Sequence, residues 1–144
     1  MLKILQIREF DPAADYPMVE GWYRGHGKEP TPLAILPKLG IVVFETDGTD
    51  ARDLGAIWLY MDNSVGVCFA EKVVTVPGLS MKRAKETLLL GVDFLKKRAA
   101  SMDYGVMVIH AFPATARMLK AAGFKEANKN MICMWDFTRE VSNG

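Results

Sequence analysis

Stretches in which apolar residues alternate with polar ones, or follow one another without a break, predict the β-strands of this chain. They cover residues 2–8, 40–46, 54–61, 65–76, 105–110 and 130–137. Polar turns at residues 47–50 and 62–64 join the second, third and fourth of these strands, which therefore form an antiparallel meander. The run at residues 105–110 has no polar face, so we expect this strand to be buried between two layers.

Apolar residues that recur every three to four positions predict three longer helices. The first begins at Pro12, with Asp11 as its cap, and its apolar face comprises Tyr16, Val19, Trp22 and Tyr23. The second spans residues 81–102 after the cap Ser80, and the third spans residues 113–123. The segment between the first helix and the second strand is rich in proline, so we expect it to be irregular apart from a short turn at residues 33–36.

The order of these elements predicts the fold class. A meander is followed by a strand–helix–strand crossover, then by a helix and a final strand. We expect one α/β (α+β) domain over residues 1–144, with a mixed, mostly antiparallel sheet of six to seven strands and helices on both faces. The stretch from residue 69 to residue 124, which holds the crossover, is the unit around which the rest of the chain is organised.

Composition and charge exclude several classes of function. The formal net charge of +1 gives no reason to expect binding to nucleic acid or to an anionic membrane. Cys68 and Cys133 lie in apolar runs, where we expect buried small hydrophobes rather than a disulfide, and they are too few for a zinc site. The first residues do not form a signal peptide and no apolar run is long enough to span a membrane, so we expect a cytoplasmic protein. We also expect no metal site.

Particular segments make the chain resemble a known family. The strand that runs into Val76-Pro77-Gly78, the long helix after it and the closing residues 119–124 resemble the GNAT N-acetyltransferase superfamily over nearly the whole chain. Residues 15–19, 22–27 and 36–40 resemble more closely a GNAT-like group encoded by phages and prophages, which would act in the cytoplasm of the bacterial host. The resemblance implies acetyl-CoA as co-substrate and an amine-bearing acceptor, with acetyl-CoA in a wedge between the strands at residues 65–76 and 106–110.

The same resemblance implies which residues bind acetyl-CoA. Val74, Thr75 and Val76 would supply backbone groups to the pantetheine arm. The start of the long helix, with its free N–H groups, would meet the pyrophosphate through Ser80, Met81, Lys82, Arg83 and Ala84. Arg117 would contact the 3′-phosphate of CoA or face water. The inner glycines of the family's phosphate loop are missing here, so Lys82 and Arg83 either compensate with their charge or are solvated helix residues.

Two residues are candidates for proton transfer. Glu71 matches the place where several GNAT enzymes keep a general base, and its alternative is a surface glutamate paired with a lysine. His110 ends its strand at the edge where ligands of α/β folds bind, and it either relays a proton or has a structural hydrogen bond. The tyrosine with which the family protonates the departing thiolate is replaced by Leu119.

The acceptor pocket is predicted around the end of the first helix, at Trp22, Tyr23 and His26, with Tyr60 from the sheet. Trp22 and Tyr23 at helical spacing are equally explained as core residues. The residues thus support two hypotheses. The first is an acyl-CoA-dependent N-acyltransferase, and the second is a GNAT-fold binding protein without catalysis, such as a phage accessory factor. An apolar final strand would also allow a homodimer.

Overall fold

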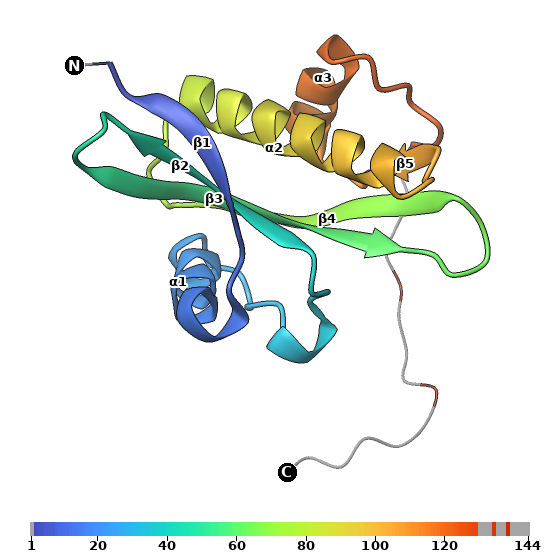
Figure 1. Ribbon diagram of the computed structural model, residues 1–144, viewed down its shortest axis with the longest axis horizontal. Coiled ribbons are helices and arrows are strands. Elements are labelled where there is room, and N and C mark those ends of the chain that lie inside the picture. Colours follow the sequence, from blue (N-terminus) through green and yellow to red (C-terminus); the bar gives the residue numbers. More distant parts are fainter. Residues whose placement is uncertain (1, 130–133, 135–137, 139–144) are drawn as a thin grey trace.

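The computed structural model describes residues 2–129 together with Met134 and Thr138. Within these residues one sheet has the strand order β1-β2-β3-β4-β5. Its strands are β1 (Ile4–Glu9), β2 (Gly40–Thr46), β3 (Ala51–Met61), β4 (Val67–Thr75) and β5 (Val106–Val108). The helices are α1 (Pro12–Gly25), the 3-10 turn η1 (Leu33–Ile35), α2 (Met81–Ser101) and α3 (Pro113–Ala121). Helix α1 covers one face of the sheet, and α2 and α3 cover the other (Figure 1).

The first four strands form the predicted meander. Each pairs in antiparallel register with its neighbour in sequence. Strand β5 follows the α2 crossover and pairs with β4 in parallel. This parallel pairing ends where Phe69 lies opposite Val108, whereas β4 itself continues to Thr75.

Two expectations about the strands need correction. Strand β3 begins at Ala51 rather than at residue 54, because its first residues pair with the end of β2 beyond an irregularity at Val43 and Phe44. The expectation that the strand at residues 105–110 is buried between layers is wrong for Val106, which is 55% exposed. Among the described residues β5 pairs with β4 alone and forms the edge of the sheet. An apolar run in this strand therefore does not mean that both of its faces are buried.

Several predictions fall on residues outside the described part of the chain. These are the strand at residues 130–137, the homodimer that this strand would allow, and the setting of Cys133. Cys68, in contrast, lies in β4 and is fully buried, as predicted. The described sheet therefore has one strand fewer than the lower limit of the sequence prediction.

The core on the α1 face explains how this helix is fixed to the sheet. Val19, Trp22 and Tyr23 of α1 pack against apolar residues of β2, β3 and β4. At the start of the helix, Asp15 accepts two hydrogen bonds from the Arg8 guanidinium, at 2.7 and 3.0 Å. Arg8 also contacts Asp53 of β3 at 3.1 Å, so one side chain links β1, α1 and β3.

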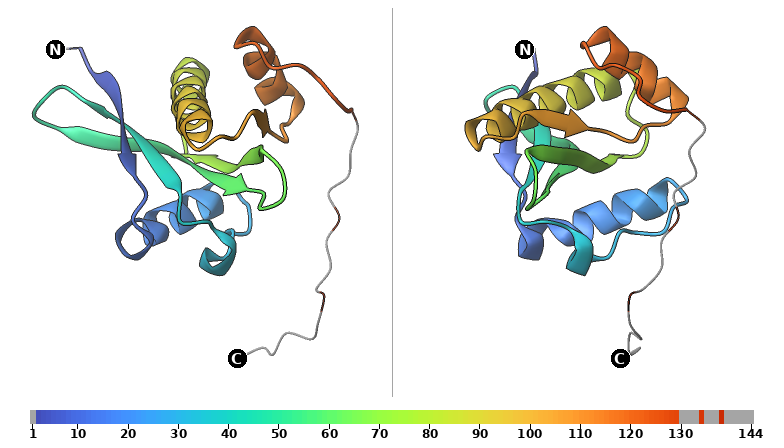
Figure 2. Two further views of the ribbon diagram at one scale, coloured as in Figure 1. Left: turned by 45° about the vertical axis from the view of Figure 1, so that its right-hand side comes forward. Right: turned by 90° about the vertical axis from the view of Figure 1, so that its right-hand side faces the viewer.

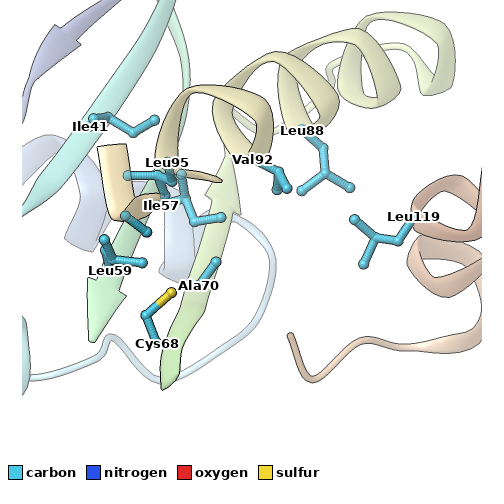
Figure 3. Close-up of a cluster of buried hydrophobic side chains, with 10 residues drawn as sticks. Ile41, Ile57, Leu59, Cys68, Ala70, Leu88, Val92, Leu95 and Leu119 are labelled. Atoms are coloured by element: carbon cyan, nitrogen blue, oxygen red, sulfur yellow. The ribbon is translucent and has the colours of Figure 1, made fainter. Parts of the chain in front are cut away.

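The core on the opposite face joins α2 and α3 to the sheet. Its buried residues come from β2, β3, β4 and both helices, and Figure 3 shows them around α2. They are Ile41, Ile57, Leu59, Cys68, Ala70, Leu88, Val92, Leu95, Ala99 and Leu119. Ser80 caps α2 as predicted, since its hydroxyl accepts from the Arg83 amide at 3.2 Å. None of the helices in the described residues combines the length and the apolar character that a membrane crossing requires.

Candidate active site

The site is built where β4 and β5 separate, a place that we call the fork. Beyond Phe69 and Val108 the two strands no longer pair. Strand β4 then carries a bulge, because Trp58 opposes Glu71 and Ala56 opposes Val74, which leaves Lys72 and Val73 opposite Ile57 alone. Lys72 has a φ of 62°, a left-handed conformation that a lysine rarely adopts.

Beyond the bulge, Thr75 directs its backbone groups away from β3. The Val76 amide donates to the Leu54 carbonyl at 2.8 Å, so these two residues form a hydrogen-bonded pair of the antiparallel ladder. Hydrogen-bonded and non-hydrogen-bonded pairs alternate, so the neighbouring pair of Thr75 and Gly55 has no hydrogen bonds between its two residues. The N–H and C=O of Thr75 therefore point away from β3 and into the fork. By the same alternation Val74 and Val76 direct theirs toward β3, so of the three predicted backbone ligands Thr75 is the one that faces the fork.

The C-terminal end of α1 is hydrogen-bonded to this part of β4. The Tyr23 hydroxyl donates to the Lys72 carbonyl at 3.0 Å, and Nε2 of His26 donates to the Thr75 carbonyl at 2.8 Å. Gly25 lies so close to the loop after β4 that a Cβ there would stand 2.5 Å from Cγ of Pro77. Residues predicted for the acceptor pocket and for the cofactor strand are thus in direct contact.

Glu71 and His110 form an ionisable pair at the fork. Oε1 of Glu71 lies 2.5 Å from Nδ1 of His110. The imidazole ring is parallel to the Phe69 ring within 8°, with 6.5 Å between ring centroids. Glu71 has a side chain that is 20% exposed, whereas the side chain of His110 is 65% exposed. Glu71 lies in β4, whereas His110 lies beyond β5, which ends at Val108 and not at His110 as predicted. The two residues predicted for proton transfer nevertheless meet.

A second contact joins the loop after α1 to the start of α3. Phe112, the cap of α3, is 76% exposed, and the Lys28 ammonium lies 5.4 Å from the centroid of its ring. The backbone of Lys28 is fixed by its amide, which donates to the Tyr23 carbonyl at 2.9 Å after Gly27 with φ 71°. Since α1 and α3 lie on opposite faces of the sheet (Figure 2), this contact reaches around the sheet edge.

The start of α2 offers free amides but not the charge of Arg83. Met81 and Lys82 have no backbone partner for their amides in the described residues, whereas the Ala84 amide donates to the Ser80 carbonyl at 2.8 Å. The Arg83 guanidinium contacts Glu45 at 2.9 Å and Glu86 at 2.7 Å, which places its charge beside β2 and away from the fork. The hydrogen bond that Arg83 donates to Glu86 is the main reason why the pKa of Arg83 is raised.

Two further cations predicted for CoA binding are exposed. Lys82 lies in the first turn of α2, and Arg117 lies on the outer side of α3. Neither makes an ion pair with another described residue, so both charges are available to a ligand. The charge of Arg83, in contrast, is paired with Glu45 and Glu86.

Every tyrosine hydroxyl donates to a backbone carbonyl. Tyr16 donates to Thr31, Tyr23 to Lys72, Tyr60 to Ile35 and Tyr104 to Asp62, at 2.8 to 3.0 Å. Burial raises the pKa of Tyr23 and of Tyr60, which keeps both phenols protonated at neutral pH. No tyrosine hydroxyl is therefore free to donate a proton to a ligand.

The predicted acceptor pocket is only partly assembled. Trp22 and Tyr23 are buried in the α1-face core, as their alternative explanation states. Tyr60 is half-buried opposite Phe69, and His26 is exposed but bonded to Thr75. Sequence reasoning missed Phe69, although it lies two positions before Glu71 and so shares its strand face. It also missed Lys28 and Phe112, for which no local pattern gives a signal.

Comparison with known proteins bears on this geometry through the fold alone. No protein-family model matches the chain, and no curated protein matches it in sequence. Solved structures do match. A Trypanosoma brucei acetyltransferase is 15% identical with a TM-score of 0.62, over 92% of this chain and 100% of that one. Glucosamine-6-phosphate N-acetyltransferase from Arabidopsis thaliana is 12% identical with a TM-score of 0.57, over 92% and 99%.

A third match was solved with a ligand. The aminoglycoside N-acetyltransferase AAC(6')-Iy in complex with CoA is 14% identical with a TM-score of 0.58, over 94% of this chain and 97% of that one. At such identities the likeness concerns the arrangement of helices and strands and not the chemistry. This protein therefore has the mixed α+β, GNAT-like fold of these acetyltransferases, as the order of its elements predicts.

Proposed function

We propose that this protein is an acyl-CoA-dependent N-acyltransferase that transfers an acetyl group from acetyl-CoA to an amine. The observation that carries the proposal is the Glu71–His110 pair at the fork, where β4 leaves the side of β5. An amine must lose a proton before it attacks a thioester, and a carboxylate–imidazole pair is suited to accept one. The acceptor itself is not specified by the residues at the fork.

The described residues fit acetyl-CoA at two places. The amide of Thr75 faces the fork and suits a ligand with amide groups such as the pantetheine arm. The free amides of Met81 and Lys82 open a helix of 21 residues, whose positive dipole end suits the pyrophosphate. The CoA complex of a protein with this fold supports the same assignment. Ser80, Arg83 and Ala84 then contribute to the shape of this helix start rather than to its charge.

Calorimetric titration with acetyl-CoA tests the proposal. We expect a saturable isotherm, and we expect Lys82→Ala to weaken binding by roughly 3- to 10-fold because it removes a cation near the pyrophosphate. Lys85→Ala, which removes an exposed cation one turn further along α2, is the matched control and should bind as the unaltered protein does. Absence of binding at millimolar acetyl-CoA would refute the proposal.

The acceptor is sought by measuring thiol release from acetyl-CoA in the presence of different amines. A suitable panel comprises a small amine, an aminoglycoside, a peptide with a free N-terminus and a peptide with an internal lysine. Each represents one class of amine acceptor that the sequence leaves open. Because acetyl-CoA is a metabolite of the cytoplasm, we propose that the protein acts there, or in the host cytoplasm if a phage encodes it.

A second function is supported by what the fork lacks. No tyrosine hydroxyl is free, and the charge of Arg83 is neutralised by Glu45 and Glu86. A GNAT-fold binding protein without turnover, such as a phage accessory factor, is compatible with both facts. Binding of acetyl-CoA with no thiol release for any amine in the panel would favour this function. The buried Trp22 and Trp58 are unsuitable probes of such a binding surface, because their replacement would disrupt the core.

A further inference from the structure

We propose that His110 is the catalytic residue of the pair, and that Glu71 is a positioning residue that acts through it. The inference rests on the proposed acyltransferase function and reverses the order of roles that the sequence favours. In this arrangement Nε2 of His110 exchanges the protons of the reaction, and the Glu71 carboxylate never contacts the substrate.

The hydrogen bond between the two side chains determines which ring nitrogen is free. A carboxylate has no proton to give, so at 2.5 Å the Nδ1–H of His110 donates to Oε1 of Glu71. In a neutral imidazole the other nitrogen then carries the lone pair. Within the described residues Nε2 has no hydrogen-bond partner, so this lone pair is available to a substrate. The arrangement is that of a carboxylate that orients a histidine base.

Exposure favours the same order of roles. Glu71 is the more buried of the two, with 20% of its side chain exposed against 65% for His110. An amine that enters from solvent therefore meets the imidazole before the carboxylate. His110 is the second residue after the end of β5, and its ring lies parallel to the Phe69 ring.

The support of Glu71 is that of a rigid positioning group. Glu71 lies in the sheet opposite Trp58, which is fully buried. The next residue, Lys72, is held by the hydrogen bond from Tyr23 to its carbonyl. A carboxylate whose backbone is supported in this way can hold an exposed imidazole in one orientation.

The proton balance of the reaction can be carried by Nε2 alone. Nε2 first removes one proton from the acceptor ammonium and releases it to water. The free amine then forms a C–N bond to the thioester carbonyl carbon, and Nε2 takes a second proton from that nitrogen. As the C–S bond breaks, Nε2 returns this proton to the sulfur. The products are the amide, the CoA thiol and one proton in solvent. No tyrosine is needed, in agreement with four tyrosine hydroxyls that are all engaged with carbonyls.

Nitrogen NMR of the full chain labelled with ¹⁵N tests the tautomer directly. We expect the His110 signal to show a protonated Nδ1 and an unprotonated Nε2 above pH 8, and to change toward the other tautomer in Glu71→Gln. The chain has two histidines, and His26→Gln assigns their signals. A protonated Nε2 in the unaltered protein would overturn the inference, whether or not the protein proves to be an acyltransferase.

Kinetics separate the two roles, with acetyl-CoA and the panel amine that releases thiol fastest. We expect His110→Gln to lower kcat by roughly 100- to 10,000-fold and to remove the acid limb of the pH profile. Glu71→Gln should lower kcat by roughly 10- to 100-fold and keep that limb, because the imidazole is still present but is less well oriented. Added imidazole should partly restore His110→Ala but not Glu71→Gln.

The opposite pattern would contradict the inference. If Glu71 is itself the base, Glu71→Gln removes the acid limb and His110→Gln keeps it. Calorimetry with acetyl-CoA on both variants provides the control, since neither residue is assigned to CoA binding and both should bind it as the unaltered protein does. If the unaltered protein does not bind acetyl-CoA, that result counts instead against the proposed function.

Discussion

Lys72 shows how a single residue shapes the fork. Its φ of 62° costs about 1 kcal/mol in a lysine, because the Cβ approaches the backbone too closely. Glycine usually occupies such positions, so the run at residues 65–76 reads as an uninterrupted strand. The conformation is held instead by the Tyr23 hydroxyl on the Lys72 carbonyl and by the register of β3 on each side. The bulge therefore depends on tertiary contacts that the local sequence does not predict.

Asp15 provides a prediction for the pH dependence of stability. The pKa of its carboxyl is lowered, chiefly by the hydrogen bonds from the Arg8 guanidinium. A carboxyl whose pKa is lower in the folded state stabilises the protein fully above the unfolded pKa of about 3.9, and this contribution is lost as the pH falls through the folded value. We expect the free energy of unfolding to fall less between pH 6 and pH 2 in Asp15→Asn than in the unaltered protein.

Denaturant unfolding at several pH values measures this effect. At pH 7 the Asp15→Asn variant should be less stable by about 1–3 kcal/mol, because the partly buried Arg8 loses a charged partner. Asp93→Asn removes an exposed carboxylate that pairs with Lys97 on α2, and it should change stability by less than about 0.5 kcal/mol. If the free energy of unfolding falls equally with pH in Asp15→Asn and in the unaltered protein, the Arg8–Asp15 pair does not contribute to the loss of stability in acid.

At the scale of elements, the end of α1 determines the shape of the fork edge. Tyr23 and His26 hydrogen-bond two carbonyls of β4, and Gly25 allows the helix to approach Pro77. The fork edge is thus supported by a helix that is far away in sequence. A change that moves the end of α1 should alter the access of a ligand to Thr75 as well as the stability of the fold.

Two glycines of α1 allow this coupling to be tested. A Cβ at Gly25 would lie 2.5 Å from Cγ of the rigid Pro77 ring, whereas a Cβ at Gly21 would meet nothing within 4 Å. Gly25→Ala should lower the free energy of unfolding by about 1–3 kcal/mol through overpacking. Gly21→Ala should raise it by about 0.5–1 kcal/mol, since alanine favours a helix interior. Equal stabilities of the two variants, measured by urea unfolding, would mean that the α1–Pro77 contact is not tight.

The elements themselves were accessible from the sequence, because their signals are local. Asp11, Ser80 and Pro113 mark helix starts that the structure confirms, and the strand at residues 40–46 has the predicted bounds. What periodicity cannot show is which partner a side chain chooses. The family resemblance predicts Arg83 at the phosphates of CoA, yet Glu45 from β2 neutralises its charge.

The pairing at the fork has the same limitation. Glu71 and His110 are 39 residues apart, and each was proposed separately for proton transfer. Their contact arises from the parallel register of β4 with β5, which the long crossover helix sets. The family resemblance indicates Glu71 as a candidate, and a predicted strand end indicates His110. The hydrogen bond that divides their roles follows only from the three-dimensional arrangement.

At the scale of the whole molecule, the chain divides into a meander and a crossover. Strands β1 to β4 contact their sequence neighbours, whereas β5 must return across α2 to reach β4. In the proposed function the meander with α1 supplies Thr75, Glu71 and His26, and the crossover supplies His110 and the start of α2. The fork lies where these halves meet, so their relative position decides the width of the proposed site.

The short parallel contact of β5 has a consequence for local opening of the native state. Since three residue pairs join β5 to β4, separating these strands breaks far fewer contacts than unfolding the meander does. We expect the amides of Val106–Val108 to exchange with deuterium faster than those of the buried β2 and β3, as mass spectrometry of peptic fragments can measure. Equal protection would contradict this. Acetyl-CoA, if it spans both strands, should slow exchange in β5 most, because a ligand in the fork holds together the least protected unit of the fold.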